Sequence, residues 1–338
     1  MSEKTKKQHY VPQCYLKAWK INEKKQIYVY DKEKQESRIN NIEDVASVRY
    51  FYDFSLRDLL SQEDIDTLFN NTDDFEAVSN IQLIEKALSD TIEKPYSDFL
   101  NKILKNAGEV SNWHLNNCYF LRPDFKEAFS GLLAVQYVRT AHVRNMISDY
   151  SDEINQLVTM MGASPQTLSK YKTLTKEEAK NIHLAMLLQE EHLSEIAFYF
   201  NRLKWVLGIN RTEIKLLTSD NPICTVPHCK YGPLQMNGLS SKGIEVFLTL
   251  SPDYILIMRD GDYHKEFAKH VMNYIEIKDK EIIEGYNAFV CMHAERSIFS
   301  VDNDFSQIEK LRAKDMSLVQ VPKSTLNWGD IIIKSRVR

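Results

Sequence analysis

The sequence predicts an α+β protein in which a central helical block packs against a mixed, mainly antiparallel β-sheet built from the N-terminal and C-terminal segments. Three observations lead to this prediction. Apolar residues recur at helical spacing from about residue 56 to residue 202. Strand-like alternation occurs on both sides of that region. The chain is 43% hydrophobic with only 10 Gly and 9 Pro, which is typical of helix-rich globular proteins.

We expect a single domain over residues 1–338. Within it, residues 1–55 form an N-terminal helix and hairpin, residues 56–202 the helical block, and residues 203–338 a β-rich part.

The N-terminal subregion begins with a short amphipathic helix. Pro12 suits the first helical position, where its missing N–H costs nothing. Helical spacing places Tyr15, Leu16 and Trp19 on one face, which is expected to be buried. The following run, "QIYVYDKEKQESRINNI", alternates around a charged turn and predicts a β-hairpin.

Helical spacing predicts three long helices in the central block, over 65–104, 124–150 and 175–205, and Pro95 predicts a kink or break in the first. Thr175 and Glu178 have the spacing of a capping box. The polar run 161–175 is expected to be irregular.

The β-rich part is expected to contain two hairpins, a helix and a further strand. The runs 202–209 and 212–220 predict strands paired around Asn210-Arg211, and 246–260 predicts a hairpin that turns at Pro252. A helix over 280–295 and a strand over 296–302 follow.

Charge and cysteine content narrow the function classes. A net charge of −4 provides no global basic field, so a purely coulombic nucleic-acid binder is excluded, although a local patch is not. The start "MSEKTKKQ" lacks a signal-peptide core and no 18-residue apolar run occurs, so no membrane partner is expected.

Five scattered cysteines suit a reducing cytoplasm. Cys224 and Cys229 lack a second ligand pair for zinc and are expected to be free thiols.

Several stretches resemble, in order, one uncharacterised prokaryotic family, domain of unknown function 4238. They are "QHYVPQCYLKAW", "IEKALSDTIEKPYSDFLNKIL", "LLAVQYVRTAHVR", "KLLTSDNPI", "FLTLSPDYILIM" and "YNAFVCMHAERSIFS". Cys14 departs from the pattern, because an aromatic residue is more usual there. The resemblance implies no established activity. It does imply an association with bacterial defence or toxin-like genes.

The first candidate site residues surround the predicted N-terminal helix start, where free backbone N–H groups attract anions. His9 is a candidate acid or base near neutral pH, and Tyr10 and Gln13 are candidate binding residues beside it. In the alternative, purely structural interpretation, Val11 packs on Tyr15 and His9 caps a neighbouring element.

The second candidate group combines one helix face with two carboxylates. Gln136 and Arg139 lie three residues apart in an apolar stretch, and a buried guanidinium needs a carboxylate partner or a polar cleft. The predicted partners are Glu85 and Glu93. On a regular α-helix these two point about 80° apart and lie two turns distant along the axis, too far for one acid–base pair on that helix alone, though another helix could complete a site. Either Gln136 and Arg139 hold an anion, or Arg139 forms a structural clamp.

The third candidate group, Ser219, Asp220 and Asn221, follows an apolar strand, and Pro222 favours an extended Asn221. Asp220 is a candidate metal ligand, base or partner that orients His9. The alternative is a local turn in which Asp220 or Asn221 bonds its own backbone.

Two functional hypotheses follow. In the first, the protein is a hydrolase or nuclease-like enzyme acting on a phosphate-bearing substrate, a nucleic acid or nucleotide. His9 and Asp220 are then catalytic, and a divalent metal is possible. In the second, the same residues bind an anionic ligand without catalysis, as in a sensor. No P-loop, dinucleotide-binding, zincin or hydrolase-elbow motif is present in the sequence.

Overall fold

The computed structural model describes residues 4–54, 63, 82–108, 122–229, 238–269, 274–320, 325–328 and 331–335. The helical prediction over 65–81 and the thiol of Cys118 lie outside these residues. The described part contains helices together with mixed and antiparallel sheets, which confirms the α+β class.

The larger sheet has five strands in the order β10-β5-β9-β8-β7. Its only parallel pair among the described strands is β10 with β5, and the other neighbours are antiparallel. The strands are β5 (Lys204–Asn210), β7 (Ile223–Pro227), β8 (Ile244–Ser251), β9 (Tyr254–Arg259) and β10 (Tyr274–Ile277).

The smaller sheet joins the two ends of the chain. Its order is β3-β2-β11-β6, with every described pair antiparallel. The predicted hairpin is confirmed as β2 and β3, and β11 lies beside β2. The strands are β2 (Gln26–Asp31), β3 (Glu36–Asn41), β6 (Thr218–Ser219) and β11 (Ser297–Ser300).

Two short antiparallel ribbons complete the described strands. They are β1 (Lys7–His9) with β4 (Ser47–Arg49), and β12 (Thr325–Trp328) with β13 (Ile331–Lys334).

Helices make up most of the rest. The longer ones are α6 (Lys94–Gly108), α7 (Pro123–Val138), α8 (Ala141–Met160), α10 (Lys176–Leu188), α11 (Glu190–Arg202), α13 (Lys280–His293) and α14 (Ser306–Lys314). The shorter ones are α1 (Gln13–Leu16), η1 (Lys17–Trp19), η2 (Ile42–Asp44), α5 (Leu83–Ala87), the π-helical η3 (Leu88–Glu93), α9 (Pro165–Lys170), α12 (Lys265–Ala268) and η7 (Met316–Val319).

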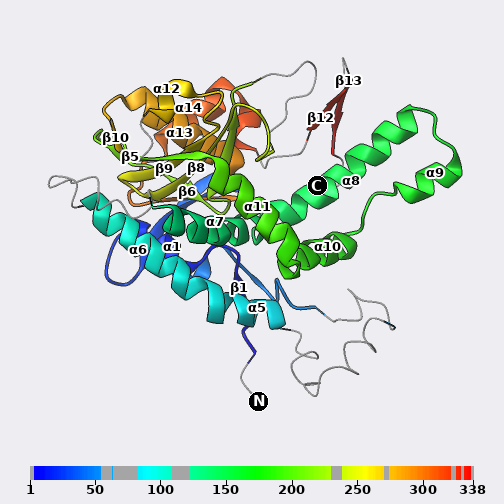
Figure 1. Cartoon of the computed structure of the whole chain (residues 1–338), viewed down its shortest axis with the longest axis horizontal. Coiled ribbons are helices and arrows are strands. Elements are labelled where there is room, and N and C mark those ends of the chain that lie inside the picture. The colour runs from blue at the N-terminus through cyan, green and yellow to red at the C-terminus, as the bar shows by residue number, and fades with distance from the viewer. Residues whose placement is uncertain are drawn as a thin grey trace.

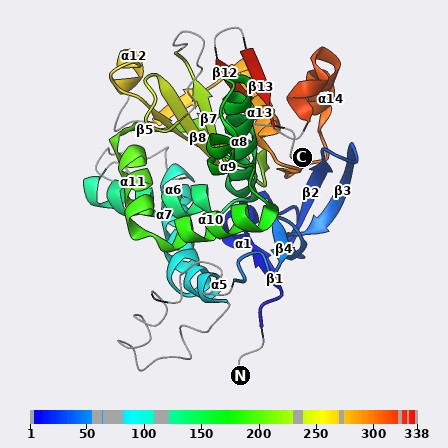
Figure 2. The same ribbon diagram turned by 90° about the vertical axis from the view of Figure 1, so that its right-hand side faces the viewer.

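The five-stranded sheet is buried on both faces. Along β5, Trp205 and Leu207 belong to a core shared with α1, α6 and α7, while Val206 between them belongs to a core shared with α13 and α14. This alternation follows from the two-residue period of a strand. Figures 1 and 2 show the result: α13 and α14 lie above the sheet, and α1 and α7 lie below it.

The predicted N-terminal helix is confirmed as α1 and η1. Tyr15, Leu16 and Trp19 are each at most 1% exposed, so the predicted face is the buried one. Two polar atoms on this face are also satisfied. The Tyr15 hydroxyl donates to the Thr249 carbonyl at 2.6 Å, and the Trp19 indole N–H donates to the Leu216 carbonyl at 3.1 Å.

Several predicted boundaries are wrong. The helix expected over 124–150 is interrupted at Arg139-Thr140, and the one expected over 175–205 at Gln189. The run 161–175 contains α9. No hairpin joins 202–209 to 212–220: β5 pairs with β9 and β10, and only Thr218-Ser219 of the later run form a strand, in the other sheet. The turn at Pro252 and the capping box at Thr175 are confirmed.

Candidate functional site

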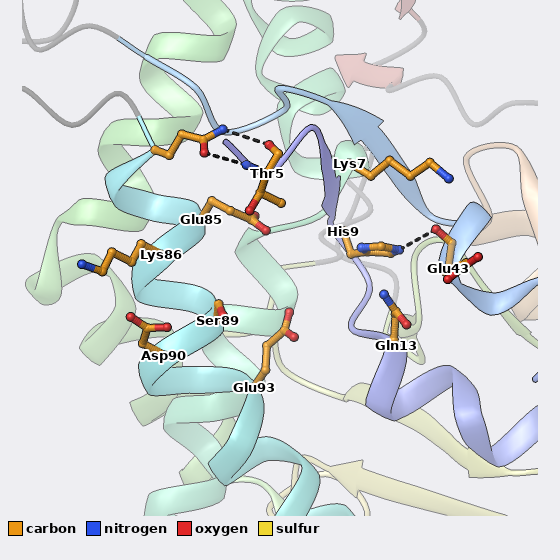
Figure 3. A pocket seen from close by; sticks show the side chains of 11 residues that line it. Thr5, Lys7, His9, Gln13, Glu43, Glu85, Lys86, Ser89, Asp90 and Glu93 are labelled. Carbon is orange, nitrogen blue, oxygen red and sulfur yellow. Dashed lines mark hydrogen bonds between the residues drawn. The ribbon is translucent and has the colours of Figure 1, made fainter. Parts of the chain in front are cut away.

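The candidate site is a pocket of about 720 Å³ between β1, α1, η2 and the helical segment α5–η3. Figure 3 shows Glu85 and Glu93 projecting from that segment toward His9 and Gln13 on the opposite wall, while Lys86 projects away. The lining residues are Thr5, Lys7, His9, Gln13, Glu43, Gln82, Glu85, Lys86, Ser89, Asp90 and Glu93. The structure therefore brings four of the predicted site residues into one pocket.

His9 is held at this position by the β1–β4 ribbon, in which it pairs with Ser47. Its ring Nε2 lies 3.2 Å from the Glu43 carbonyl oxygen, an interaction that requires the Nε2–H tautomer or the protonated ring. Burial lowers the pKa of His9 below its usual value near 6.5, although the Glu43 carbonyl and Glu93 partly oppose this. His9 is therefore mainly a neutral imidazole at pH 7.

Glu85 and Glu93 share the pocket because the helix between them is not regular. Pro95 has no N–H to bond the preceding turn, and that turn, Leu88–Glu93, is π-helical. A π turn holds more residues than an α turn, so each residue rotates less around the axis. The angle between the two side chains is thereby smaller than in the regular helix that the sequence suggested, and both line the pocket. The irregularity predicted at Pro95 is therefore a π-helical turn, Leu88–Glu93, which ends just before the proline.

The two carboxylates lie in different electrostatic surroundings. Burial raises the pKa of Glu85 to about 7; the Arg139 charge opposes that rise, and Glu93 adds to it. Glu93 accepts a hydrogen bond from the Arg139 guanidinium at 3.1 Å and forms an ion pair with it.

Arg139 lies behind the pocket wall, with 1% of its surface exposed. Arg139 is the C-terminal cap of α7. Its Nη2 donates to the His9 carbonyl at 2.5 Å and also to Glu93. Gln136, one turn earlier, donates to the Tyr10 carbonyl at 3.4 Å. These bonds fix β1 and Glu93 to α7. Of the two interpretations of Arg139, the geometry supports the structural clamp.

Asp220 lies in a different part of the fold from this pocket. Its two carboxylate oxygens accept three backbone N–H groups, from Glu295 at 2.8 Å, Arg296 at 2.9 Å and Ser297 at 2.8 Å. Burial raises its pKa to about 6, and the three amides partly oppose that shift. Of the described residues that line the pocket, none comes from 219–221.

The neighbours of Asp220 are engaged in the same junction. The Asn221 backbone N–H donates to the Ser219 hydroxyl at 3.1 Å, which closes a local turn, and the Asn221 side chain donates to the His293 carbonyl at 3.1 Å. Tyr10 reaches toward this junction: burial raises its pKa well above the usual value, and the charges of Asp220 and Glu295 raise it further. The turn is thus closed by the Ser219 hydroxyl, whereas the Asp220 and Asn221 side chains, which the local-turn alternative assigned to their own backbone, bond the distant segment 293–297.

The sequence did not single out several residues of the pocket. Lys7 lies in the β1–β4 ribbon, Thr5 just before it and Glu43 in η2, and no local pattern indicated that these segments meet at the pocket. Gln82 lies three residues before Glu85, Ser89 four residues after it, and Asp90 three residues before Glu93, so helical spacing from the two carboxylates was a usable signal for these three. Lys86 is the immediate neighbour of Glu85 and had no such signal.

No group of three or more His, Cys, Asp or Glu side chains among the described residues is arranged to hold a metal ion. Cys224 and Cys229 are free thiols, as expected. Nor is any helix within the described ranges both long and apolar enough to cross a bilayer.

Comparison with known proteins identifies a family and no activity. No curated protein and no solved structure matches the chain. Residues 7–304 match the family model described as "Protein of unknown function (DUF4238)", and the chain therefore belongs to that family.

Proposed function

We propose that the protein is a hydrolase in which Glu85 and Glu93 act as the acid–base pair. The observation that carries this proposal is that one pocket holds two carboxylates in contrasting surroundings. A carboxyl group that keeps its proton near neutral pH, next to a carboxylate held by a guanidinium, is an arrangement suited to acid–base catalysis. In this proposal Glu85 and Glu93 take the catalytic role that the sequence suggested for His9 and Asp220.

Each residue has a role that its contacts support. A carboxyl group with a pKa near 7 gives up and takes back a proton at neutral pH, which suits Glu85 as the general acid. Glu93, ion-paired with Arg139, is then the base that activates water. His9, mainly neutral, orients substrate from the opposite wall together with Gln13.

The pocket charges favour an uncharged or positively charged substrate. Glu43, Glu85, Asp90 and Glu93 line it, against two lysines. Lys7 is ion-paired with Asp44 outside the lining, and Lys86 and Asp90 both project to the outer side of their helix, so the excess of negative charge comes from the glutamates. The phosphate-bearing substrate stays a prediction with less support, because a phosphate there meets carboxylates and few free cations. Roles as a nuclease and in bacterial defence also stay predictions.

A screen for turnover tests the proposal. The purified protein is incubated with nitrophenyl glycosides, esters and phosphates, and with RNA, DNA and nucleotides, with and without Mg²⁺. We expect any turnover to fall at least about 100-fold in Glu85→Gln and in Glu93→Gln, as loss of an acid or base does. Asp98→Asn is the control and should keep the wild-type rate, because Asp98 is an exposed residue of α6 whose partner among the described residues is Lys94.

Two results decide against the acid–base pair. Wild-type turnover in a folded Glu85→Gln or Glu93→Gln variant refutes it. If no substrate turns over but an amine such as spermidine binds in a way that Glu85→Gln weakens, the pocket is a non-catalytic binding site. That outcome corresponds to the sensor hypothesis, with a cation in place of the expected anion.

A further inference from the structure

A second cavity lies on the opposite side of the molecule from the candidate site, which we call the acidic pocket because Glu43, Glu85 and Glu93 line it. Its volume is about 190 Å³, and it opens between α13 and the strands β7, β8 and β9. Figures 1 and 2 place α13 at the top of the molecule and β1 and α5 at the bottom. The lining residues are Val226, His228, Glu245, Arg259, Ile282, Gly285, Tyr286 and Phe289, none of which borders the acidic pocket.

One side of this cavity is a buried charge network. Glu245, whose side chain is 3% exposed, accepts hydrogen bonds from Arg259 Nε at 2.8 Å, His228 Nε2 at 2.8 Å and the Tyr286 hydroxyl at 2.9 Å. These donors lower the pKa of Glu245 below its usual value despite its burial. The carboxylate is thus fully engaged, and it holds Arg259 and His228 in fixed positions. Both remain partly accessible, with 26% and 36% of their side chains exposed.

Arg259 is further fixed from its other side. Its guanidinium carbon lies 4.6 Å from the centre of the Phe267 ring, which suits a cation–π contact. A guanidinium held through Nε and an aromatic face is preorganised, so little side-chain entropy is lost when its other N–H groups bind a ligand.

The opposite wall is apolar and includes a glycine in the middle of a helix. A Cβ built on Gly285 meets no described atom within 4 Å, so no close packing requires a glycine here. Glycine inside a helix is less favourable than alanine. At Gly285 the missing side chain leaves open space in the wall of the cavity.

We propose that this cavity is a binding site for a small aromatic carboxylate. A cavity of about 150 Å³ is known to accept a benzene ring, so 190 Å³ has room for one ring. The ring contacts Ile282, Gly285 and Phe289, and the carboxylate accepts hydrogen bonds from Arg259, the side chain best suited to that geometry. The Glu245 charge is paired with Arg259 and its oxygens also accept hydrogen bonds from His228 and Tyr286, which weakens its repulsion of the ligand.

Binding of benzoate, followed by protein NMR or calorimetry at pH 7, tests the proposal on the full chain. We expect benzyl alcohol, which has the same ring without the charge, to bind at least tenfold more weakly. We expect Gly285→Leu to weaken benzoate at least tenfold, because its side chain occupies the space of the ring. Gly131→Leu is the matched control: Gly131 also lies inside a helix with no described atom within 4 Å of a Cβ, and it does not line the cavity.

A second variant separates charge from shape. Arg259→Met should remove the preference for benzoate over benzyl alcohol while the alcohol binds as before. Absence of benzoate binding to the wild type overturns the proposal, as does equal binding of the two probes or unchanged benzoate binding in Gly285→Leu. None of these results depends on whether Glu85 and Glu93 catalyse a reaction.

Discussion

Replacing Asp220 by asparagine tests whether this aspartate holds the fold together. The carboxylate accepts three buried backbone N–H groups through two oxygens, and the asparagine amide offers one oxygen. At least one N–H then faces an NH₂ group and loses its acceptor, which costs about 1 to 3 kcal/mol. Two remaining bonds change from charge-assisted to neutral, at roughly 1 kcal/mol each. The bonds alone predict a loss of about 3 to 5 kcal/mol. Burial raises the pKa of Asp220 to about 6, so the neutral asparagine avoids roughly 3 kcal/mol of charge burial at pH 7, and the expected net loss is about 0 to 2 kcal/mol.

Urea unfolding at pH 7 and 25 °C, followed by the fluorescence of the buried Trp19 and Trp205, measures this loss. Asp304→Asn is the control, because Asp304 accepts one exposed backbone N–H from Ser306, which an amide oxygen also accepts. We expect that control to change stability by less than about 0.5 kcal/mol. A clear gain in stability in Asp220→Asn would refute the clamp.

Three further predictions concern stability alone. The pKa of Glu85 is raised to about 7, so the wild type loses stability as pH rises from about 4.5 to 7. The Glu85→Gln side chain cannot ionise, so the free energy of unfolding of this variant should equal that of the wild type at pH 4. At pH 8 it should be higher by about 1 to 2 kcal/mol, a figure reduced because Glu85 is only partly buried. Chemical unfolding that gives the same pH profile for both proteins would contradict this. Thr175→Ala removes the capping box with Glu178 and should cost about 1 kcal/mol, read as a lower melting temperature. Gly208→Ala places a Cβ 2.6 Å from Ile255 in the core and should cost about 1 to 3 kcal/mol, whereas an unchanged melting temperature would show that the neighbours give way freely.

Features that depend on neighbours along the chain were predictable from the sequence. The buried face of Tyr15, Leu16 and Trp19 followed from helical spacing, and the hairpin of β2 and β3 from alternation. The pairing of Glu93 with Arg139 was predicted from a different argument: a charge in an apolar stretch must find its opposite.

Features that depend on distant segments were not predictable. Asp220 is bonded by amides 75 to 77 residues later, and nothing near Asp220 in sequence indicates them. The strand β5 is apolar on both faces, so its pattern does not identify β9 and β10 as its neighbours. Pro95 indicated an irregular helix but not the type of irregularity, which is the π turn between Glu85 and Pro95.

The contacts of the N-terminal helix also constrain how the protein is made. Tyr15 bonds to Thr249, 234 residues later in the chain. A ribosome adding about 5 to 20 residues per second needs roughly 10 to 50 s to reach that partner after Tyr15 is made. Throughout that interval the apolar face of Tyr15, Leu16 and Trp19 has no sheet to cover it. This apolar face is therefore made well before the strand that covers it, and chaperones that bind exposed apolar segments have time to act on it.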